Sequence, residues 1–322
     1  SIERLFEGFV KAAVTAIEQR DPTTSGHSLR VAQMTVALAE AVDRTDQGAY
    51  RLTRFSPEQV REIRYAGLLH DFGKVGVREQ VLVKAKKLYP ADLGLVRLRQ
   101  AFLYRTAQWE FERARADFLE RHGSEGYAPF LDGLRARFDA ERDTLERFLR
   151  VVMDSNEPTV LAEGNFEALR EFAERTYESL DGTALPWLTG DEVRYLSIRK
   201  GSLDEAERLE IESHVTHTYW FLRNIPWTKE LQGIPDIAHG HHEKLDGSGY
   251  PRRVTAPAIP VQTRMMTISD IFDALTASDR PYKRALPLTR ALDIMADEVK
   301  GGQLDADLFR IFVDAKAFEK RD

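Results

Sequence analysis

The hydrophobic and polar positions of this chain follow a helical period through nearly all of its length. No run alternates apolar and polar residues for long enough to indicate a sheet, so we predict an all-α fold. A second helix is predicted to begin near His27, and Ser56 with Gln59 forms a predicted capping box at the start of a third. The first helix, within residues 1–20, has one apolar stripe: Phe6, Phe9, Val10, Ala13, Val14 and Ile17.

Charged and imidazole side chains continue the apolar faces of two of these predicted helices. His70, Asp71 and Lys74 follow the inward face of the third helix. Another helix, over about residues 204–222, carries His214 and His217 about one turn apart, so spacing alone does not decide which of the two points inward. Buried charge is costly unless it is paired or bound to a metal, so these positions are candidates for a metal site.

Further metal-type ligands lie near the end of the sequence. A short predicted helix delivers His241 and His242, and an apolar run over residues 266–275 is interrupted only by Asp270 and Asp273. The two oxygens of an aspartate such as Asp71 can bridge two cations, while neutral imidazoles fill their outer positions. A hydroxide held between such cations can attack a phosphodiester. The first hypothesis is therefore a two-metal hydrolase of phosphate esters.

Composition narrows the chemistry. The chain has 322 residues and no cysteine, which excludes disulfides and thiolate metal sites and leaves His, Asp, Glu and water as ligands. A net charge of −6 argues against a nucleic-acid binder with a basic surface. No stretch approaches the roughly 18 consecutive apolar residues of a membrane span, and the first residues are unlike a secretory signal. We expect a soluble protein that does not bind a membrane.

Four segments follow one another in the order of a known family's motifs: GHSLRVA (Gly26–Ala32), LLHDFGKVGV (Leu68–Val77), HHEKLDGSGYP (His241–Pro251) and ISDIFDALTASDRPYK (Ile268–Lys283). In these segments the sequence resembles the HD-GYP branch of the HD-domain metal-dependent phosphohydrolases. The resemblance implies an HD-domain helical bundle. It also implies a bacterial, cytoplasmic enzyme that degrades the second messenger cyclic di-GMP.

The resemblance assigns roles to particular residues. Asp71 is the expected bridge between two metals, and Lys74 is similar to a family lysine that faces the site and stabilises a phosphate oxygen. Arg280 and Lys283 resemble residues that clamp the substrate phosphates, and Tyr250 of the GYP turn is assigned to the substrate site. The implied metal ligands are His27, His70, Asp71, His214, His241, His242 and Asp270.

One position departs from part of the family. Some members have a glutamate that helps to hold a third metal, and here that position is Thr23, a poor substitute for a carboxylate. We therefore predict two metal ions, with iron favoured and manganese as a substitute. The resemblance then implies attack by a metal-bridging hydroxide, with hydrolysis that stops at the linear dinucleotide pGpG more readily than it continues to GMP.

The segment between the signatures is longer than the chemistry requires. We predict that residues 1–88 and 189–322 form the two parts of the catalytic core and that residues 89–188 are a helical insertion. Within it, Leu95, Phe102 and Trp109 recur every seven residues, as do apolar residues from Leu131 to Val152 at helical spacing, which predicts a helical hairpin or arm. A third amphipathic segment, which includes Leu180, is expected to return to the core.

Alternatives remain open for partners and function. The insertion is either a packing arm with solvated faces or a surface for homodimer formation or a partner. The GYP turn either contacts diguanylate cyclase (GGDEF) domains, as the resemblance implies, or is simply a turn. One rival function is a receptor that binds cyclic di-GMP or a partner protein without turnover. The other is a phosphodiesterase for another cyclic dinucleotide.

Overall fold

The computed structural model describes residues 2–21, 25–277 and 285–319. Most of the described residues are helical and the only strands among them form one short pair, which confirms the predicted all-α fold. The chain divides into two compact units, one made of Ser1–Val83 with Glu207–Asp322 and the other of Lys84–Ala206. The division predicted from the sequence, at residues 88 and 188, stays a prediction.

The first unit is a bundle in which α2 packs against both α3 and α11. The predicted capping box begins α3: Ser56 accepts from the Gln59 amide, the Gln59 side chain accepts from the Ser56 amide, and Pro57 is the first helical residue. Its elements are α1 (Ile2–Arg20), α2 (His27–Arg44), α3 (Pro57–Leu69), η2 (Phe72–Gly76), α4 (Glu79–Leu82), α9 (Glu205–Arg223), η3 (Lys229–Leu231), α10 (Ile234–His239), η4 (Ala256–Ala258), α11 (Val261–Thr276), α12 (Leu288–Lys300) and α13 (Ala306–Asp314).

Two apolar clusters hold the helices of this unit. One joins α2 and α11 to α12 and α13 and contains Leu38, Ile268 and Phe312. The other joins the same α2 and α11 to α1, α3, α9 and α10. Because α2 and α11 are packed on both sides, the polar residues that they carry between the clusters are held on rigid elements. Phe9, predicted on the buried stripe of α1, is instead 53% exposed.

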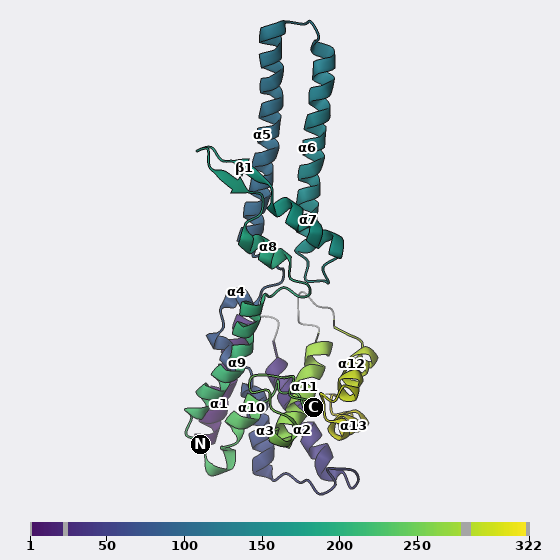
Figure 1. The fold of residues 1–322 in the computed structure, drawn as a ribbon. Coiled ribbons are helices and arrows are strands. Elements are labelled where there is room, and N and C mark those ends of the chain that lie inside the picture. Colours follow the sequence, from purple (N-terminus) through teal and green to yellow (C-terminus); the bar gives the residue numbers. More distant parts are fainter. Residues whose placement is uncertain (1, 22–24, 278–284, 320–322) are drawn as a thin grey trace. The chain divides into compact units, whose positions relative to one another are not determined.

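The second unit contains the predicted helical hairpin. Helices α5 and α6 run side by side in opposite directions, joined by a short turn (Figure 1). At one end of the hairpin, Phe148, Phe172 and Trp187 form an aromatic core with ring centroids 5.2 to 6.0 Å apart. The elements are α5 (Pro90–His122), α6 (Tyr127–Ser155), α7 (Glu163–Ala173), β1 (Thr176–Glu178), β2 (Ala184–Pro186) and α8 (Gly190–Leu196).

Two sequence predictions about this unit are wrong in detail. The hairpin seam uses Phe111, whose ring is tilted against Phe138 of α6, and Phe118, which stacks on Phe130 of α6. Leu95 and Trp109 are instead 56% and 58% exposed. Helix α5 is apolar on two faces, so a seven-residue period does not say which face is covered. The antiparallel pair β1–β2 was not predicted, because three-residue strands are too short to show alternation, and Leu180 between them is 95% exposed.

Candidate metal centre

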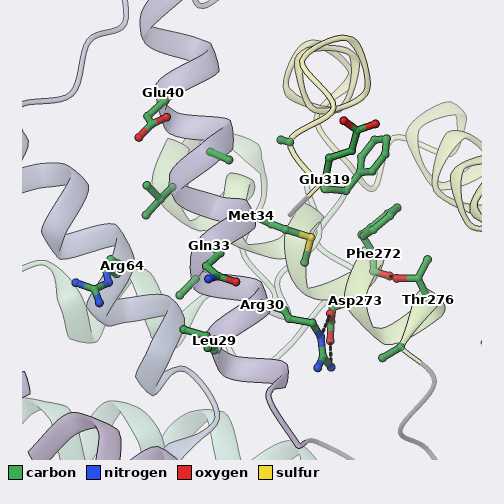
Figure 2. Close-up of a pocket in the computed structure, with 16 residues that line it drawn as sticks. Leu29, Arg30, Gln33, Met34, Glu40, Arg64, Phe272, Asp273, Thr276 and Glu319 are labelled. Atoms are coloured by element: carbon green, nitrogen blue, oxygen red, sulfur yellow. Dashed lines mark hydrogen bonds and ion pairs between the residues drawn. The ribbon is translucent and has the colours of Figure 1, made fainter. Parts of the chain in front are cut away.

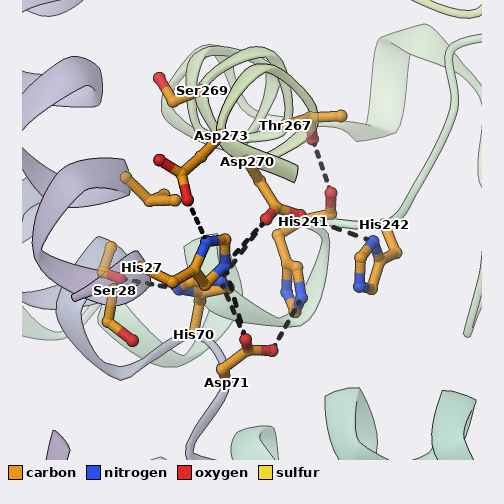
Figure 3. A network of polar contacts seen from close by, with 12 residues as sticks. His27, Ser28, His70, Asp71, His241, His242, Thr267, Ser269, Asp270 and Asp273 are labelled. Carbon is orange, nitrogen blue, oxygen red and sulfur yellow. Dashed lines mark hydrogen bonds and ion pairs between the residues drawn. The ribbon is translucent and has the colours of Figure 1, made fainter. Parts of the chain in front are cut away.

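Five helices of the first unit, α2, α3, α9, α10 and α11, bring all seven predicted ligands together. Figure 3 shows the arrangement of His27, His70, Asp71, His241, His242 and Asp270. His27 is the first residue of α2, and His70 and Asp71 directly follow α3. His214 comes from α9, His241 and His242 follow α10, and Asp270 comes from α11. Three groups of these side chains each have ligand atoms within 4.8 Å of one another: His214 with His241 and His242, His27 with His70 and Asp71, and His70 with His241 and Asp270.

A close backbone approach fixes the segment that carries Asp71. A Cβ atom at Gly73 would lie 1.9 Å from the carbonyl oxygen of His214, so only glycine allows η2 to pack this tightly on α9. The hydroxyl of Thr218 accepts from the Gly73 amide at 2.8 Å and donates to the His70 carbonyl at 2.9 Å. The register between the HD segment and His214 is thereby set by the main chain.

Asp71 lies between two sets of imidazoles. Its Oδ1 atom is 3.2 Å from Nε2 of His214 and 4.0 Å from Nε2 of His241. Its Oδ2 atom is 3.6 Å from Nε2 of both His27 and His70. One carboxylate therefore faces a pair of ring nitrogens on each side, which is the arrangement expected of a bridging ligand.

Asp270 faces the same space from α11. Its Oδ1 atom is 3.2 Å from Nε2 of His27 and 3.8 Å from Nε2 of His70, and its Oδ2 atom is 3.8 Å from Nδ1 of His242. His242 is the most exposed of the group, with 30% of its side chain accessible, whereas the side chains of His70 and His241 are fully buried. The cluster is thus accessible from the His242 side.

Hydrogen bonds on the far side of four rings orient their Nε2 atoms. The Nδ1 atoms of His70, His214 and His241 lie 2.7, 2.6 and 2.7 Å from the carbonyl oxygens of Gly67, Ile211 and Ala238. Nδ1 of His27 lies 2.7 Å from Oδ2 of Asp273. A ring that donates from Nδ1 presents an unprotonated Nε2, the form that binds a metal.

The charge state of the cluster suits a cation. Burial would raise the pKa of Asp71, but Lys74 and the neighbouring histidines outweigh it and hold this pKa well below its usual range. Burial lowers the pKa of His70, His241 and His242, for His242 to about 4, so these rings are neutral at neutral pH. For His27 burial acts in the same direction, but Asp270 and Asp273 overcome it and raise its pKa to about 9. The carboxylates of Asp270 and Asp273 therefore favour a positive charge at the position of His27.

Lys74 adds a buried cation beside Asp71. Its ammonium is 2.9 Å from Oδ2 of Asp71 and 3.0 Å from Oδ2 of Asp21. Burial would lower the pKa of Lys74, but these two carboxylates raise it to about 12, so the side chain stays charged. Arg20 holds the same segment, because its guanidinium donates to the carbonyl oxygens of Val75 and Val77.

The donor set fits a pair of divalent cations. Among the described residues, Nε2 of His70 is buried and has no hydrogen-bond partner, although a buried polar atom normally has one. This atom points toward the two carboxylates, where a bound cation would satisfy it. Imidazole and carboxylate ligands without thiolate suit iron or manganese. The seven residues would hold the ions, and their role as ligands stays a prediction.

The other predicted site residues have different outcomes. Tyr250 lies over His242, with ring centroids 4.7 Å apart, and its amide donates to the His242 carbonyl. A Cβ atom at Gly249 would be 2.4 Å from the Lys244 amide nitrogen, so glycine permits this tight return of the chain. Arg280, Lys283 and Thr23 lie outside the described residues.

Several neighbouring residues do not belong to the cluster. His217, the alternative to His214, is exposed on α9. Glu243 accepts from the amides of Arg252 and Val254. Asp246 caps its turn by accepting from Ser248. His239 stacks on Tyr219 at 4.2 Å, away from the cluster.

Three functional candidates escaped the sequence reasoning: Asp21, Arg30 and Asp273. Asp21 had no role assigned from the sequence, and its carboxylate forms an ion pair with Lys74. Asp273 was noted only as a neighbour of Asp270, and it contacts both His27 and Arg30. The sequence did contain an indication for Asp273, because it is the second carboxylate in the apolar run over residues 266–275. Arg30 had no such signal, because its partner is 243 residues away.

A groove of about 510 Å³ lies against the same helices (Figure 2). Arg30 and Asp273 form part of its wall, and the rest is mainly apolar, with Met34 and Phe272 among the lining residues. The groove thus reaches the residues that hold His27.

Comparison with known proteins agrees with this site. Two family models described as HD domain match residues 24–155 and 180–308. The chain is 44% identical to a 3′3′-cGAMP-specific phosphodiesterase of Vibrio cholerae over 101 residues, 31% of this chain and 21% of that protein. It is 39% identical to a cyclic di-GMP phosphodiesterase of Pseudomonas aeruginosa over 82 residues, 26% of this chain and 19% of that protein.

A longer match covers nearly the whole chain, including residues 89–188. A probable cyclic di-GMP phosphodiesterase of Vibrio cholerae is 22% identical over 312 residues, 97% of this chain and 45% of that protein. The chain thus spans less than half the length of these relatives. With the two domain matches, these similarities show that the chain belongs to the HD-domain phosphohydrolase family. None of the described helices has the length and apolar character needed to cross a membrane.

Proposed function

We propose that this chain is a metal-dependent phosphodiesterase of cyclic dinucleotides, of the HD-GYP branch of its family. The observation that carries the proposal is the two-sided arrangement at Asp71, whose oxygens each face two Nε2 atoms. Such an array suits two neighbouring cations. When bound, the cations would polarise a phosphoryl oxygen and make water a nucleophile at neutral pH.

The residues of the chain orient and charge this centre. Lys74 keeps a positive charge 2.9 Å from Asp71, where it stabilises the charge that develops on a phosphoryl oxygen, and Asp21 fixes its position. The half-buried His242 and Tyr250 lie on the accessible side of the cluster. We place the substrate there, with Tyr250 against it and with Arg280 and Lys283 as the phosphate clamp that the resemblance implies.

Cyclic di-GMP is the proposed substrate, because several relatives carry that activity in their names. A second candidate is 3′,3′-cGAMP, favoured by the 44% identity to a phosphodiesterase specific for it.

We propose two metal ions, iron or manganese, and pGpG as the main product from cyclic di-GMP. The proposed partners are diguanylate cyclase domains at the GYP turn and a second copy through the helical insertion. The rival function, a receptor without turnover, predicts binding with no product.

The test is hydrolysis by the manganese-loaded or anaerobically iron-loaded protein, with products separated by chromatography. Wild-type protein should cleave cyclic di-GMP or 3′,3′-cGAMP, and His214→Ala should abolish cleavage. His217→Ala is the matched control, because His217 lies one turn away on the same helix and is exposed. Binding of both dinucleotides without product would support the receptor function and overturn the proposal.

A further inference from the structure

The imidazole of His27 is held differently from those of His70, His214 and His241. Backbone carbonyl oxygens three residues earlier in the chain accept from Nδ1 of His70, His214 and His241. For His27 the partner is the carboxylate of Asp273, which comes from α11, 246 residues away. The orientation of His27 therefore depends on a side chain, whereas that of the other three depends on the main chain.

Arg30 holds this carboxylate in turn. Its Nε donates to Oδ1 of Asp273 at 2.6 Å and its Nη2 to Oδ2 at 2.9 Å, a bidentate pair (Figure 2). Asp273 is 5% exposed, whereas Arg30 is 31% exposed and lines the groove. Arg30 also donates to the carbonyl oxygen of Ser25, just before His27. The pair thus fixes both the ring of His27 and the chain that leads to it.

We propose that Asp273 and Arg30 are positioning residues that set the affinity of one of the two metal positions, the one on the His27 side of Asp71. The inference rests on the metal centre of the proposed function. A carboxylate partner makes an imidazole a stronger donor than a carbonyl partner does, and it holds the metal-binding tautomer. The other position, beside His214 and His241, has no side-chain support of this kind among the described residues. The two positions therefore differ in their dependence on Asp273.

The test measures binding of Mn²⁺ alone, by titration monitored with electron paramagnetic resonance. Two close Mn²⁺ ions give a spin-coupled signal and a single ion does not, so the spectrum distinguishes the two states. Asp273→Asn keeps an acceptor for His27 and removes the charge. It should weaken one Mn²⁺ about 10- to 100-fold and replace the coupled signal by that of a single ion. Arg30→Ala should act in the same direction, and Arg30→Lys should recover part of the affinity.

Arg64→Ala is the matched control. Arg64 lines the same groove, but its ion-pair partner at 3.4 Å is Glu7, which is not a predicted ligand, so this variant should bind Mn²⁺ as the wild type does. Should Asp273→Asn fail to fold, the variants of Arg30, which is only partly buried, carry the test. Unchanged binding in Arg30→Ala and Asp273→Asn, or equal weakening of both ions, would overturn the inference. Wild-type protein that binds no Mn²⁺ would instead contradict the proposed function itself.

Discussion

Replacement of Gly73 by alanine tests how the fold positions the metal centre. The new Cβ atom would lie 1.9 Å from the His214 carbonyl oxygen and 2.4 Å from the Thr218 amide nitrogen, both main-chain atoms. Ordinary van der Waals contact begins near 3.4 Å, so η2 and α9 must separate by about 1.5 Å. Overpacking of this kind costs typically ~1–3 kcal/mol of folding stability.

The same separation should disable the site. Asp71 and His214 lie on the two sides of this contact, with 3.2 Å between Oδ1 and Nε2. Metal–ligand distances tolerate only about ±0.2 Å, so a shift of about 1.5 Å removes a shared ligand. We expect Gly73→Ala to lose metal affinity and to lower the hydrolysis rate by ~100-fold or more. The assays are metal titration, hydrolysis kinetics and thermal unfolding of the same preparation.

Gly94→Ala provides the control for this substitution. Gly94 lies within α5, and no described atom outside its immediate surroundings is within 4 Å of the position of its Cβ. Alanine there should leave activity unchanged and stabilise the helix by about 0.5–1 kcal/mol. If Gly73→Ala retained the melting temperature, the metal content and the activity of the wild type, the account of the η2–α9 contact would be refuted.

Three further predictions follow from individual contacts. Asp21→Asn removes one of the carboxylates that hold Lys74, and it should lower kcat about tenfold, or about 1.5 kcal/mol, with metal content unchanged, as measured by saturation kinetics. Burial lowers the pKa of His239 to about 4, so as the pH falls from about 6.5 to 4 this residue binds a proton in the unfolded chain but not in the folded one. The free energy of unfolding should therefore decrease over this pH range. His239→Phe should make the decrease smaller, as measured by denaturation experiments. Phe148→Ala should cost ~3–5 kcal/mol and accelerate hydrogen exchange within residues 84–206.

Much of the fold was predictable because the signals are local. The capping box at Ser56 and Gln59 depends on residues three apart, and helical periodicity located α1, α2, α9 and α11 to within a few residues. The His-Asp and His-His pairs drew attention to His70, Asp71, His241 and His242, because such side chains on apolar faces require a partner. The full set of seven ligands was named only from the resemblance to the HD-GYP family. Their meeting in one cluster is a property of the fold and appears only in the structure.

The remainder depends on contacts between distant segments. Nothing near Arg30 in the sequence indicates that its guanidinium binds Asp273, and nothing near Asp21 indicates Lys74. The prediction for α5 failed for a related reason. Leu95 and Trp109 have the spacing of a buried face but are exposed, because α6 packs against a different face of α5. Periodicity predicts a helix and its apolar faces, and tertiary packing determines which of these faces is buried.

The most direct test of the central claim is hydrolysis of cyclic di-GMP and 3′,3′-cGAMP as a function of Mn²⁺ added to metal-free protein. Because Asp71 has one oxygen toward each set of imidazoles, the account predicts that the rate rises only as the second equivalent of Mn²⁺ binds. Full activity with a single bound ion, or no hydrolysis of either dinucleotide with two ions bound, would contradict it.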